Sequence, residues 1–164
     1  MKKTKSNKDG LTIRALTSKD ANAYFQIARE DEDLKRYARF FIVSSIDEAK
    51  KKIVSYTSHN EAVYGLFKSN RLVAVFDVND DFDETGAVDG AIVHYFVGKK
   101  YRGNNYAYRG IKKLASELAQ EYLKLKFEIR KTNHASLGVQ AKLGSTIDES
   151  YPSKECQLFE YSLE

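Results

Sequence analysis

Residues 97–107, Val97-Gly98-Lys99-Lys100-Tyr101-Arg102-Gly103-Asn104-Asn105-Tyr106-Ala107, join a run of apolar residues to a long amphipathic segment. The apolar run, 91–97, has one polar interruption at His94 and is typical of a strand in the centre of a sheet. The connection has the form of a strand-to-helix turn, whose backbone N–H groups and positive helix end can bind an anion, and Arg102 adds formal charge. By spacing alone, the turn is either a phosphate site or a plain connection.

The chain that follows this turn changes its hydrophobic period abruptly. Apolar residues recur at spacings of three and four across 107–122, which predicts a long helix with one apolar face. Across 123–130 apolar and charged residues alternate, which is the period of a strand. A last helix is predicted over Asn133–Leu143, ended by Gly144, and two short strands follow around Ile147 and at 158–163.

The chain that precedes the turn contains a strand, three helical pieces and a hairpin. A strand is predicted at 11–16, a first helix after Thr17, a second short helix up to Ala38, and a third from Ile46 to about Thr57. Strands at 62–68 and 72–78 are joined by a tight turn at 69–71, and 80–84 is expected to be an acidic loop. The order β-α-α-α-β-β-β-α-β-α-β-β predicts a single α/β (α+β) sheet with both parallel and antiparallel strands.

Composition favours one globular domain, 11–164, behind a basic leader. The chain has 164 residues, of which 42% are hydrophobic, and a formal net charge of +4. Residues 1–10 hold four lysines against one aspartate, so the remaining chain is nearly neutral. We interpret the leader as a solvated, disordered segment, with an RNA-binding arm as the alternative.

Several classes of protein are disfavoured by the same composition. No apolar run is long enough to span a bilayer, and no secretory signal is evident. Cys156 is the only cysteine, which excludes an internal disulfide and a zinc site built from several thiolates, and no metal site is predicted. We expect a cytoplasmic protein that binds no specific nucleic acid, and the sequence is compatible with a monomer or a homodimer.

Two segments resemble the motifs of a known family. Arg102 through Ala107 is similar to the acetyl-CoA-binding motif of the GNAT N-acetyltransferases, with Asn105 in place of the family's central glycine. Asn133-His134-Ala135-Ser136, with the ending Lys142-Leu143-Gly144, resembles the family's second motif. With Ile13-Arg14-Ala15-Leu16-Thr17 and Asp20, the resemblance spans roughly 11–164 and looks closest to the ribosomal-protein-alanine acetyltransferase-like branch.

The resemblance implies a fold and a cofactor site. The fold would be a twisted, mainly antiparallel sheet of about seven strands with one splayed parallel pair and about four flanking helices. Acetyl-CoA would be the co-substrate, and no metal would be needed. The cofactor-binding residues that the resemblance implies are Phe96, Val97, Arg102, Gly103, Asn104, Asn105, Tyr106, Ala107, Asn133 and Ser136. Asn133 is also interpreted as an N-cap of the last helix, and the two roles are compatible. Tyr106 and Tyr108 are interpreted as packing residues or adenine contacts rather than as acids.

The implied reaction is direct attack of a neutral amine on the thioester. The N–H of Val97 or a neighbour would bind the thioester carbonyl. His94 is the candidate base, with a core histidine as its alternative and Asp89 or Glu84 acting through water as other bases. Many family members carry a tyrosine at the position of Gln140, so Ser136 becomes the candidate contact for the leaving thiolate, or else only satisfies backbone groups of its helix.

The acceptor is expected to be a protein N-terminus or a small-molecule amine. The acidic residues of 80–84, together with Asp89, favour a cationic substrate if they lie at the mouth of the site, and otherwise form a solvated loop. Two other functions remain open. The chain could be a weakly active or inactive acyl-CoA-binding or protein-interaction module, or an RNA- or ribosome-associated factor that uses the leader.

Overall fold

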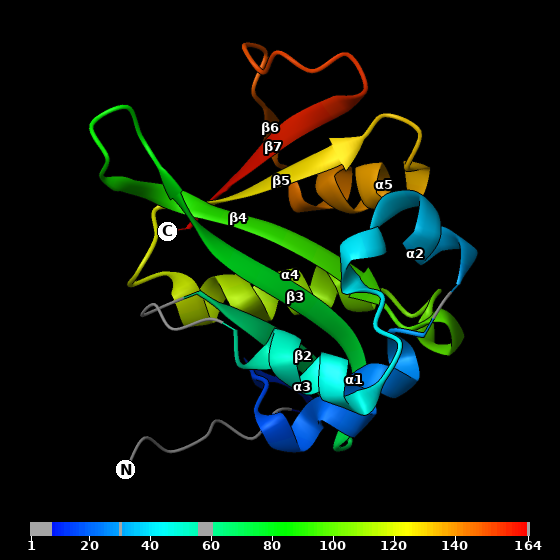
Figure 1. The fold of residues 1–164 in the computed structure, drawn as a ribbon. Helices are drawn as coiled ribbons and strands as arrows, with labels where there is room; N and C mark the ends of the chain where they lie inside the picture. The colour runs from blue at the N-terminus through cyan, green and yellow to red at the C-terminus, as the bar shows by residue number, and fades with distance from the viewer. Residues whose placement is uncertain (1–7, 30, 56–60, 164) are drawn as a thin grey trace.

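The computed structural model describes residues 8–29, 31–55 and 61–163, which form a seven-stranded sheet flanked by helices (Figure 1). The strand order is β1-β2-β3-β4-β5-β7-β6. Neighbouring strands pair antiparallel except β4 and β5, which are parallel. The strands are β1 (Leu11–Ala15), β2 (Ala62–Lys68), β3 (Arg71–Phe82), β4 (Val88–Val97), β5 (Lys124–Arg130), β6 (Thr146–Ile147) and β7 (Cys156–Ser162).

The helices cover both faces of the sheet. They are α1 (Ala21–Ile27), α2 (Glu32–Tyr37), α3 (Ile46–Ile53), α4 (Tyr106–Leu118) and α5 (His134–Leu143), with short 3₁₀ turns at Ser18–Asp20, Arg39–Phe41 and Lys99–Tyr101. Buried residues of α4 pack with one face of the sheet in one apolar cluster. Those of α1, α2 and α3 pack with the other face in a second cluster. Each helix has an apolar stripe along one side and must bury that stripe against the sheet, so helices cover both faces of the sheet.

The two halves of the sheet separate at the parallel pair. Ladder pairs join β4 to β5 only at Ala91 with Leu125 and at Ile92 with Lys126. Beyond them the described residues Val93–Val97 pair with β3 but have no ladder partner on β5. The C-terminal half of β4 therefore leaves one edge of its backbone free, which confirms the expected splayed pair.

Several predicted boundaries were wrong. Residues 80–84 are not simply a loop, because β3 runs to Phe82 and pairs with a β4 that begins at Val88. The end of β3 is polar and lacks the apolar alternation by which a strand is predicted from sequence. Its Asp80 and Asp81 nevertheless pair across the hairpin with Ala91 and Gly90. The long helix ends at Leu118 rather than Tyr122; Tyr122 is nevertheless buried, and its hydroxyl donates to Asp80 at 2.5 Å.

The remaining elements follow the predicted order. The turn at 69–71 forms with positive φ at Ser69 and Asn70. The third helix begins after Ser45, whose side chain accepts from Glu48 N, and ends at Ile53; Thr57 lies outside the described residues. Of the expected leader, residues 1–7 also lie outside them, whereas Asp9 forms an ion pair with Arg109 of α4 at 3.3 Å. Within the described residues, no helix has the length and apolarity to cross a bilayer.

Candidate active site

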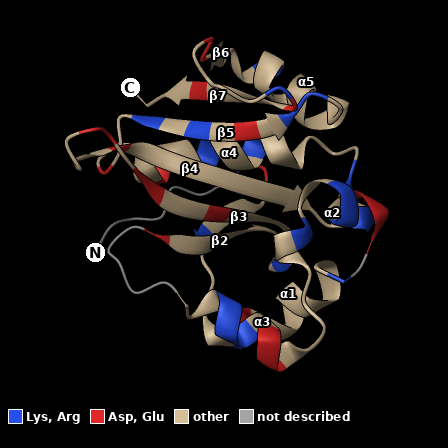
Figure 2. Ribbon diagram, turned by 45° about the horizontal axis from the view of Figure 1, so that its top comes forward, with Lys and Arg blue, Asp and Glu red and all other residues tan. Residues whose placement is uncertain are grey.

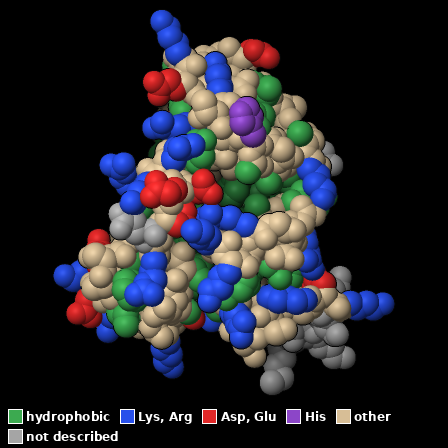
Figure 3. Space-filling view, turned by 90° about the vertical axis from the view of Figure 1, so that its right-hand side faces the viewer, with side chains coloured by type: hydrophobic (Ala, Val, Ile, Leu, Met, Phe, Trp, Pro, Cys, Tyr) green, Lys and Arg blue, Asp and Glu red, His purple; other side chains and the backbone are tan. Residues whose placement is uncertain are grey.

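A hollow of 390 Å³ lies at the C-terminal end of β4, between the loop 101–107, α2 and the start of α5. In Figure 3 this side of the molecule carries a recess floored by hydrophobic side chains, with acidic and basic side chains beside it. Of the predicted site residues, the structure brings to this first hollow Phe96, Val97, Arg102, Gly103, Asn105, Tyr106, Ala107, Asn133 and Ser136. Asn104 is exposed and donates to Tyr101 O at 3.0 Å instead.

The loop that opens α4 has the backbone shape of an anion cradle. Asn105 is the N-cap of α4 and has φ 64° and ψ 23°, in the left-handed region. Gly103 also has a positive φ, of 82°. The first N–H groups of a helix have no partner within the helix, so those at the start of α4 are free to bind oxygen atoms. Asparagine tolerates this conformation better than other non-glycine residues, and the tight loop forms without the family's glycine.

The guanidinium of Arg102 is held by acidic residues at the start of α2. Its Nη1 lies 2.9 Å from Asp33 Oδ2 and its Nη2 lies 3.1 Å from Asp31 Oδ2. Its Nε donates to the carbonyl of Val97 at 3.1 Å. The charge that we expected to face a pyrophosphate is thus already paired. The sequence signal was present as the acidic residues Asp31, Glu32 and Asp33 at the start of α2, but local sequence does not show which distant residue they pair with.

A second hollow, of 340 Å³, opens on the other side of the splay and is lined by His94 and by residues of β5. It shares lining residues with the first hollow, namely Tyr37, Ala38, Tyr95, Asn133 and Ser136. The two hollows therefore meet where β4 leaves β5.

His94 lies in this second hollow against the aromatic ring of Phe40, with ring centroids 5.0 Å apart. Burial lowers the pKa of His94, and the charges of Asp77 and Glu128 partly oppose that shift. Asp77 is 5% exposed and is the cross-strand partner of His94 on β3. The imidazole is therefore kept neutral near neutral pH, as a proton acceptor must be.

Asn133 and Ser136 begin α5. The side chain of Asn133 accepts a hydrogen bond from Ser136 N at 3.3 Å, so it caps the helix as well as lining both hollows. Nearby, Tyr37 of α2 donates its hydroxyl to Thr132 O at 3.0 Å. This bond ties the end of α2 to the loop before α5.

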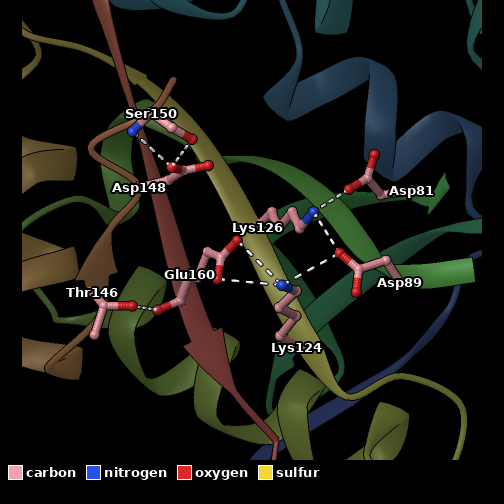
Figure 4. A network of polar contacts seen from close by, with 8 residues as sticks. All are labelled: Asp81, Asp89, Lys124, Lys126, Thr146, Asp148, Ser150 and Glu160. Atoms are coloured by element: carbon pink, nitrogen blue, oxygen red, sulfur yellow. Dashed lines mark hydrogen bonds and ion pairs between the residues drawn. The ribbon is translucent and has the colours of Figure 1, made fainter. Parts of the chain in front are cut away.

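The acidic residues around 80–89 do not line either hollow. Asp89 lies 3.3 Å from Lys124 Nζ and 3.0 Å from Lys126 Nζ, and Asp81 also contacts Lys126 (Figure 4). These lysines belong to β5, along which charged residues alternate with apolar ones, as the blue and red segments of the ribbon in Figure 2 show. The carboxylates join the β3–β4 hairpin to β5, so they do not form the cation-attracting mouth that the sequence suggested. Glu84, the other proposed water-mediated base, is exposed in the hairpin.

Sequence reasoning did not identify Tyr95 as a site residue. Tyr95 lines both hollows, and its hydroxyl is buried. Alternation along β4 could have placed it on the face of α5. Among the described residues, no group of three or more His, Cys, Asp or Glu is arranged to hold a metal ion.

Solved structures with the same fold include several acetyltransferases. RimL, a ribosomal L7/L12 alpha-N-protein acetyltransferase solved in complex with coenzyme A, superposes with a TM-score of 0.77 at 16% identity, covering 94% of each chain. The acetyltransferase yncA from Salmonella typhimurium, solved with its cofactor acetyl-CoA, gives a TM-score of 0.74 at 14% identity, covering 94% of this chain and 95% of that one. The Escherichia coli ribosomal-protein-S18-alanine N-acetyltransferase gives 0.65 at 18% identity, covering 94% of each chain.

A comparison of the sequence with models of protein families agrees with the similarity of fold. No curated protein sequence matches the chain. The sequence model of the acetyltransferase (GNAT) domain matches residues 10–146, which is most of the chain and includes β4, the anion cradle and all of α5. The chain therefore belongs to the GNAT acetyltransferase domain family.

Proposed function

We propose that the protein transfers an acetyl group from acetyl-CoA to a primary amine, by direct attack of the amine within a ternary complex. The observation that carries the proposal is the meeting of two hollows at the splayed strands, one beside an anion cradle and the other beside the half-buried His94. Such an arrangement can hold a thioester and an amine on opposite sides of one gap. Bringing two reactants together in this way is itself a large part of catalysis.

The cofactor would occupy the first hollow. Its pyrophosphate is assigned to the N–H groups at the start of α4, around Asn105, Tyr106 and Ala107, where the helix dipole also favours negative charge. Its pantetheine arm is assigned to the gap between β4 and α5, beside Phe96 and Asn133. Because the charge of Arg102 is paired with Asp31 and Asp33, we assign Arg102 to positioning the loop rather than to binding phosphate.

The free edge of β4 offers a donor for the thioester oxygen. The Val97 carbonyl accepts from Arg102, and the next residue, Gly98, donates its N–H to Val73 of β3 at 2.9 Å. Since successive residues of a strand alternate the side to which they donate, the Val97 N–H faces away from β3 and toward the gap. A fixed N–H at that position would stabilise the negative charge that develops on the carbonyl oxygen.

His94 is assigned as the base that removes a proton from the attacking amine. It lies in the second hollow, and its lowered pKa keeps it unprotonated at neutral pH. Ser136, which lines both hollows, is assigned to contact the sulfur of the leaving thiolate. Only the free amine is nucleophilic, so a neutral imidazole suits the first task.

The acceptor is proposed to be a protein N-terminus or a small-molecule amine, as in the ribosomal-protein-alanine acetyltransferase-like branch that the two motifs resemble. A cationic acceptor is favoured by Glu128, which lines the second hollow together with His94. We propose a cytoplasmic location on the evidence of the single cysteine.

A second candidate function is an acyl-CoA-binding or protein-interaction module with little or no activity. The specific observation that favours it is the pairing of Arg102 with two carboxylates, which removes a positive charge from the cofactor side. This candidate binds acetyl-CoA weakly or not at all, and it acetylates amines slowly or not at all.

Thermal unfolding with and without millimolar acetyl-CoA tests the cofactor site. A ligand at about 100 times its dissociation constant adds about 2.7 kcal/mol to the free energy of unfolding, so the midpoint rises clearly. Adenosine alone should not reproduce the rise. Ala107→Glu, which places a carboxylate in the hollow, should abolish it, whereas Ser116→Glu, on an exposed part of the same helix, should retain it. A folded protein with no rise would reject the assignment.

A further inference from the structure

The second hollow contains one carboxylate and one guanidinium. Of the described residues that line it, Glu128 alone is acidic and Arg130 alone is a lysine or arginine. The hydroxyl of Tyr151 donates to Glu128 and holds that carboxylate in place. The guanidinium of Arg130, in contrast, makes no ion pair or hydrogen bond within the part of the chain that the structure describes. An unpaired guanidinium at the wall of a hollow is available to an anionic group of a ligand.

Strand register places both charges on the face of the sheet that bears His94. Ile92 of β4 and Lys126 of β5 are ladder partners, so their side chains lie on the same face. His94 and Glu128 each follow by two residues, so they lie on this face at about the same height across the splay. Arg130 lies two residues beyond Glu128, about 7 Å along the strand.

The size and the apolar wall of this hollow suit a small molecule. Its volume is 340 Å³, within the range of small-molecule sites. Phe40, on the 3₁₀ turn after α2, lines it beside His94, with ring centroids 5.0 Å apart, and its side chain is still 45% exposed. A ligand could therefore cover an aromatic surface with its carbon skeleton while its charged groups meet β5.

We propose that the acceptor is a free α-amino acid and that Arg130 binds its carboxylate. This inference rests on the proposed function, because it names the acceptor of that reaction. An α-amino acid carries its amino group and its carboxylate on one carbon atom, so the amino group can lie between His94 and Glu128 while the carboxylate meets Arg130. A guanidinium binds a carboxylate through two parallel hydrogen bonds, which fixes the orientation of the amino group as well.

Peptide N-termini and polyamines fit these charges less well. The first carboxyl group of a peptide is an amide, which would leave Arg130 without an anionic partner. A polyamine would bring a second ammonium group towards the guanidinium, and like charges in one hollow repel each other. Glu128 suits all three acceptors, so Arg130 is the residue that discriminates among them.

The transfer to an amino acid balances with the groups already assigned. His94 takes one proton from the ammonium, and the free amine nitrogen bonds to the carbonyl carbon of the thioester. The carbon–sulfur bond breaks with its electron pair on sulfur, and a second proton of the nitrogen passes to that sulfur. The products are an N-acetylamino acid and CoA as the thiol, and His94 returns its proton to water.

The test compares CoA release with free amino acids and with the corresponding amino-acid amides. Alanine, leucine, methionine and phenylalanine each provide one matched pair, with acetyl-CoA as the donor. We expect kcat/KM to be at least about tenfold higher for the free acid, because hydrogen bonds between charged groups are the stronger ones. The amide has the lower amine pKa and so more free amine at neutral pH, which means that amine protonation cannot produce this preference.

Arg130→Gln isolates the guanidinium. In this variant kcat/KM for the free acids should fall about tenfold, so that acid and amide are used about equally. Lys131→Gln is the matched control, because it removes the same charge from an exposed neighbour outside both hollows, and it should keep the preference for the acid. Both variants should unfold at the wild-type temperature, since neither side chain has a partner among the described residues.

Two results would overturn the inference and leave the proposed function intact. One is a wild-type protein that acetylates amides, peptides or polyamines at least as well as free amino acids. The other is an Arg130→Gln variant that keeps the preference for the free acid. A folded wild-type protein that releases no CoA with any of these amines would overturn both the inference and the proposed function.

Discussion

At the scale of single residues, Asn105 decides whether the anion cradle can form. It holds a left-handed conformation at the N-cap of α4, and its side chain makes no capping hydrogen bond there. Asn105 therefore shapes the loop through its backbone conformation and not through a hydrogen bond of its side chain. A family position that normally holds glycine can accept asparagine, because asparagine is the side chain least penalised in this region.

Two substitutions at Asn105 test this interpretation. Asn105→Ala should lower the free energy of unfolding by about 1 kcal/mol, because alanine is disfavoured in the left-handed region. Asn105→Gly should change it by no more than about 0.5 kcal/mol, since glycine adopts the conformation freely but gains entropy in the unfolded chain. Urea unfolding measures both. Equal stability of the alanine and wild-type proteins would show that the loop does not need this conformation.

His94 links protonation to stability. Its pKa in the folded protein lies below its ordinary value of 6.5 because the ring is buried. The unfolded state therefore binds the proton more tightly, and the free energy of unfolding rises with pH. The contribution of His94 is complete above about pH 6.5 and is lost as the pH falls below that value.

His94→Gln should flatten the pH dependence of the free energy of unfolding between about pH 5 and about pH 7. His134→Gln, at an exposed position of α5, is the control and should leave the slope as it is. The same His94 variant should lower kcat with hydroxylamine by about 10²-fold if the residue is the base. An unchanged slope would contradict the burial of His94, and an unchanged rate would contradict its role as base.

At the scale of elements, α2 joins the two sides of the splay. Its N-terminal end holds Arg102 of the cofactor loop through Asp31 and Asp33, and its C-terminal Tyr37 bonds to Thr132 before α5. A helix of six residues has little intrinsic stability and depends on such contacts. It thereby connects the loop 101–107 to the start of α5 beside the first hollow.

Close packing of α4 on β3 places the cradle at the end of β4. A Cβ added at Gly110 would lie 2.3 Å from Phe76 Cζ, so Gly110→Ala should lower the free energy of unfolding by about 1–3 kcal/mol. Gly138 on α5 has no atom within 4 Å of the corresponding position. Gly138→Ala should therefore raise the free energy of unfolding by about 0.5–1 kcal/mol, because alanine is more favourable than glycine inside a helix. Denaturant unfolding of both variants measures these two changes. A Gly110→Ala variant more stable than the wild type would contradict the close packing of Gly110 against Phe76.

At the scale of the whole molecule, hydrophobic period was enough to predict the order of strands and helices. The alternation at 124–130 and the three-four spacing after Ala107 each reflect burial against one neighbour, which is a local signal. The length of the β3–β4 hairpin was missed because its outer end is polar. There Asp81 and Asp89 are matched by lysines of β5, a distant part of the chain.

The parts of the candidate site that depend on local backbone conformation could be predicted from sequence. The parts in which side chains distant in sequence meet could not. Gly103, Asn105, Tyr106, Ala107 and Asn133 were chosen from local sequence and line one hollow, and their role in cofactor binding stays a prediction. The pairing of Arg102 with Asp33 spans 69 positions of sequence. The burial of the Tyr95 hydroxyl depends on how α5 packs against the sheet, which local patterns do not specify.

The central claim is tested most directly by mass spectrometry of a panel of primary amines incubated with the protein and acetyl-CoA labelled in its acetyl group. The panel should contain peptides with a free N-terminal alanine, polyamines and hydroxylamine. The account predicts that at least one amine gains the labelled acetyl group, and that His94→Gln slows this transfer. Binding of acetyl-CoA without transfer to any amine would contradict the account and support the binding module.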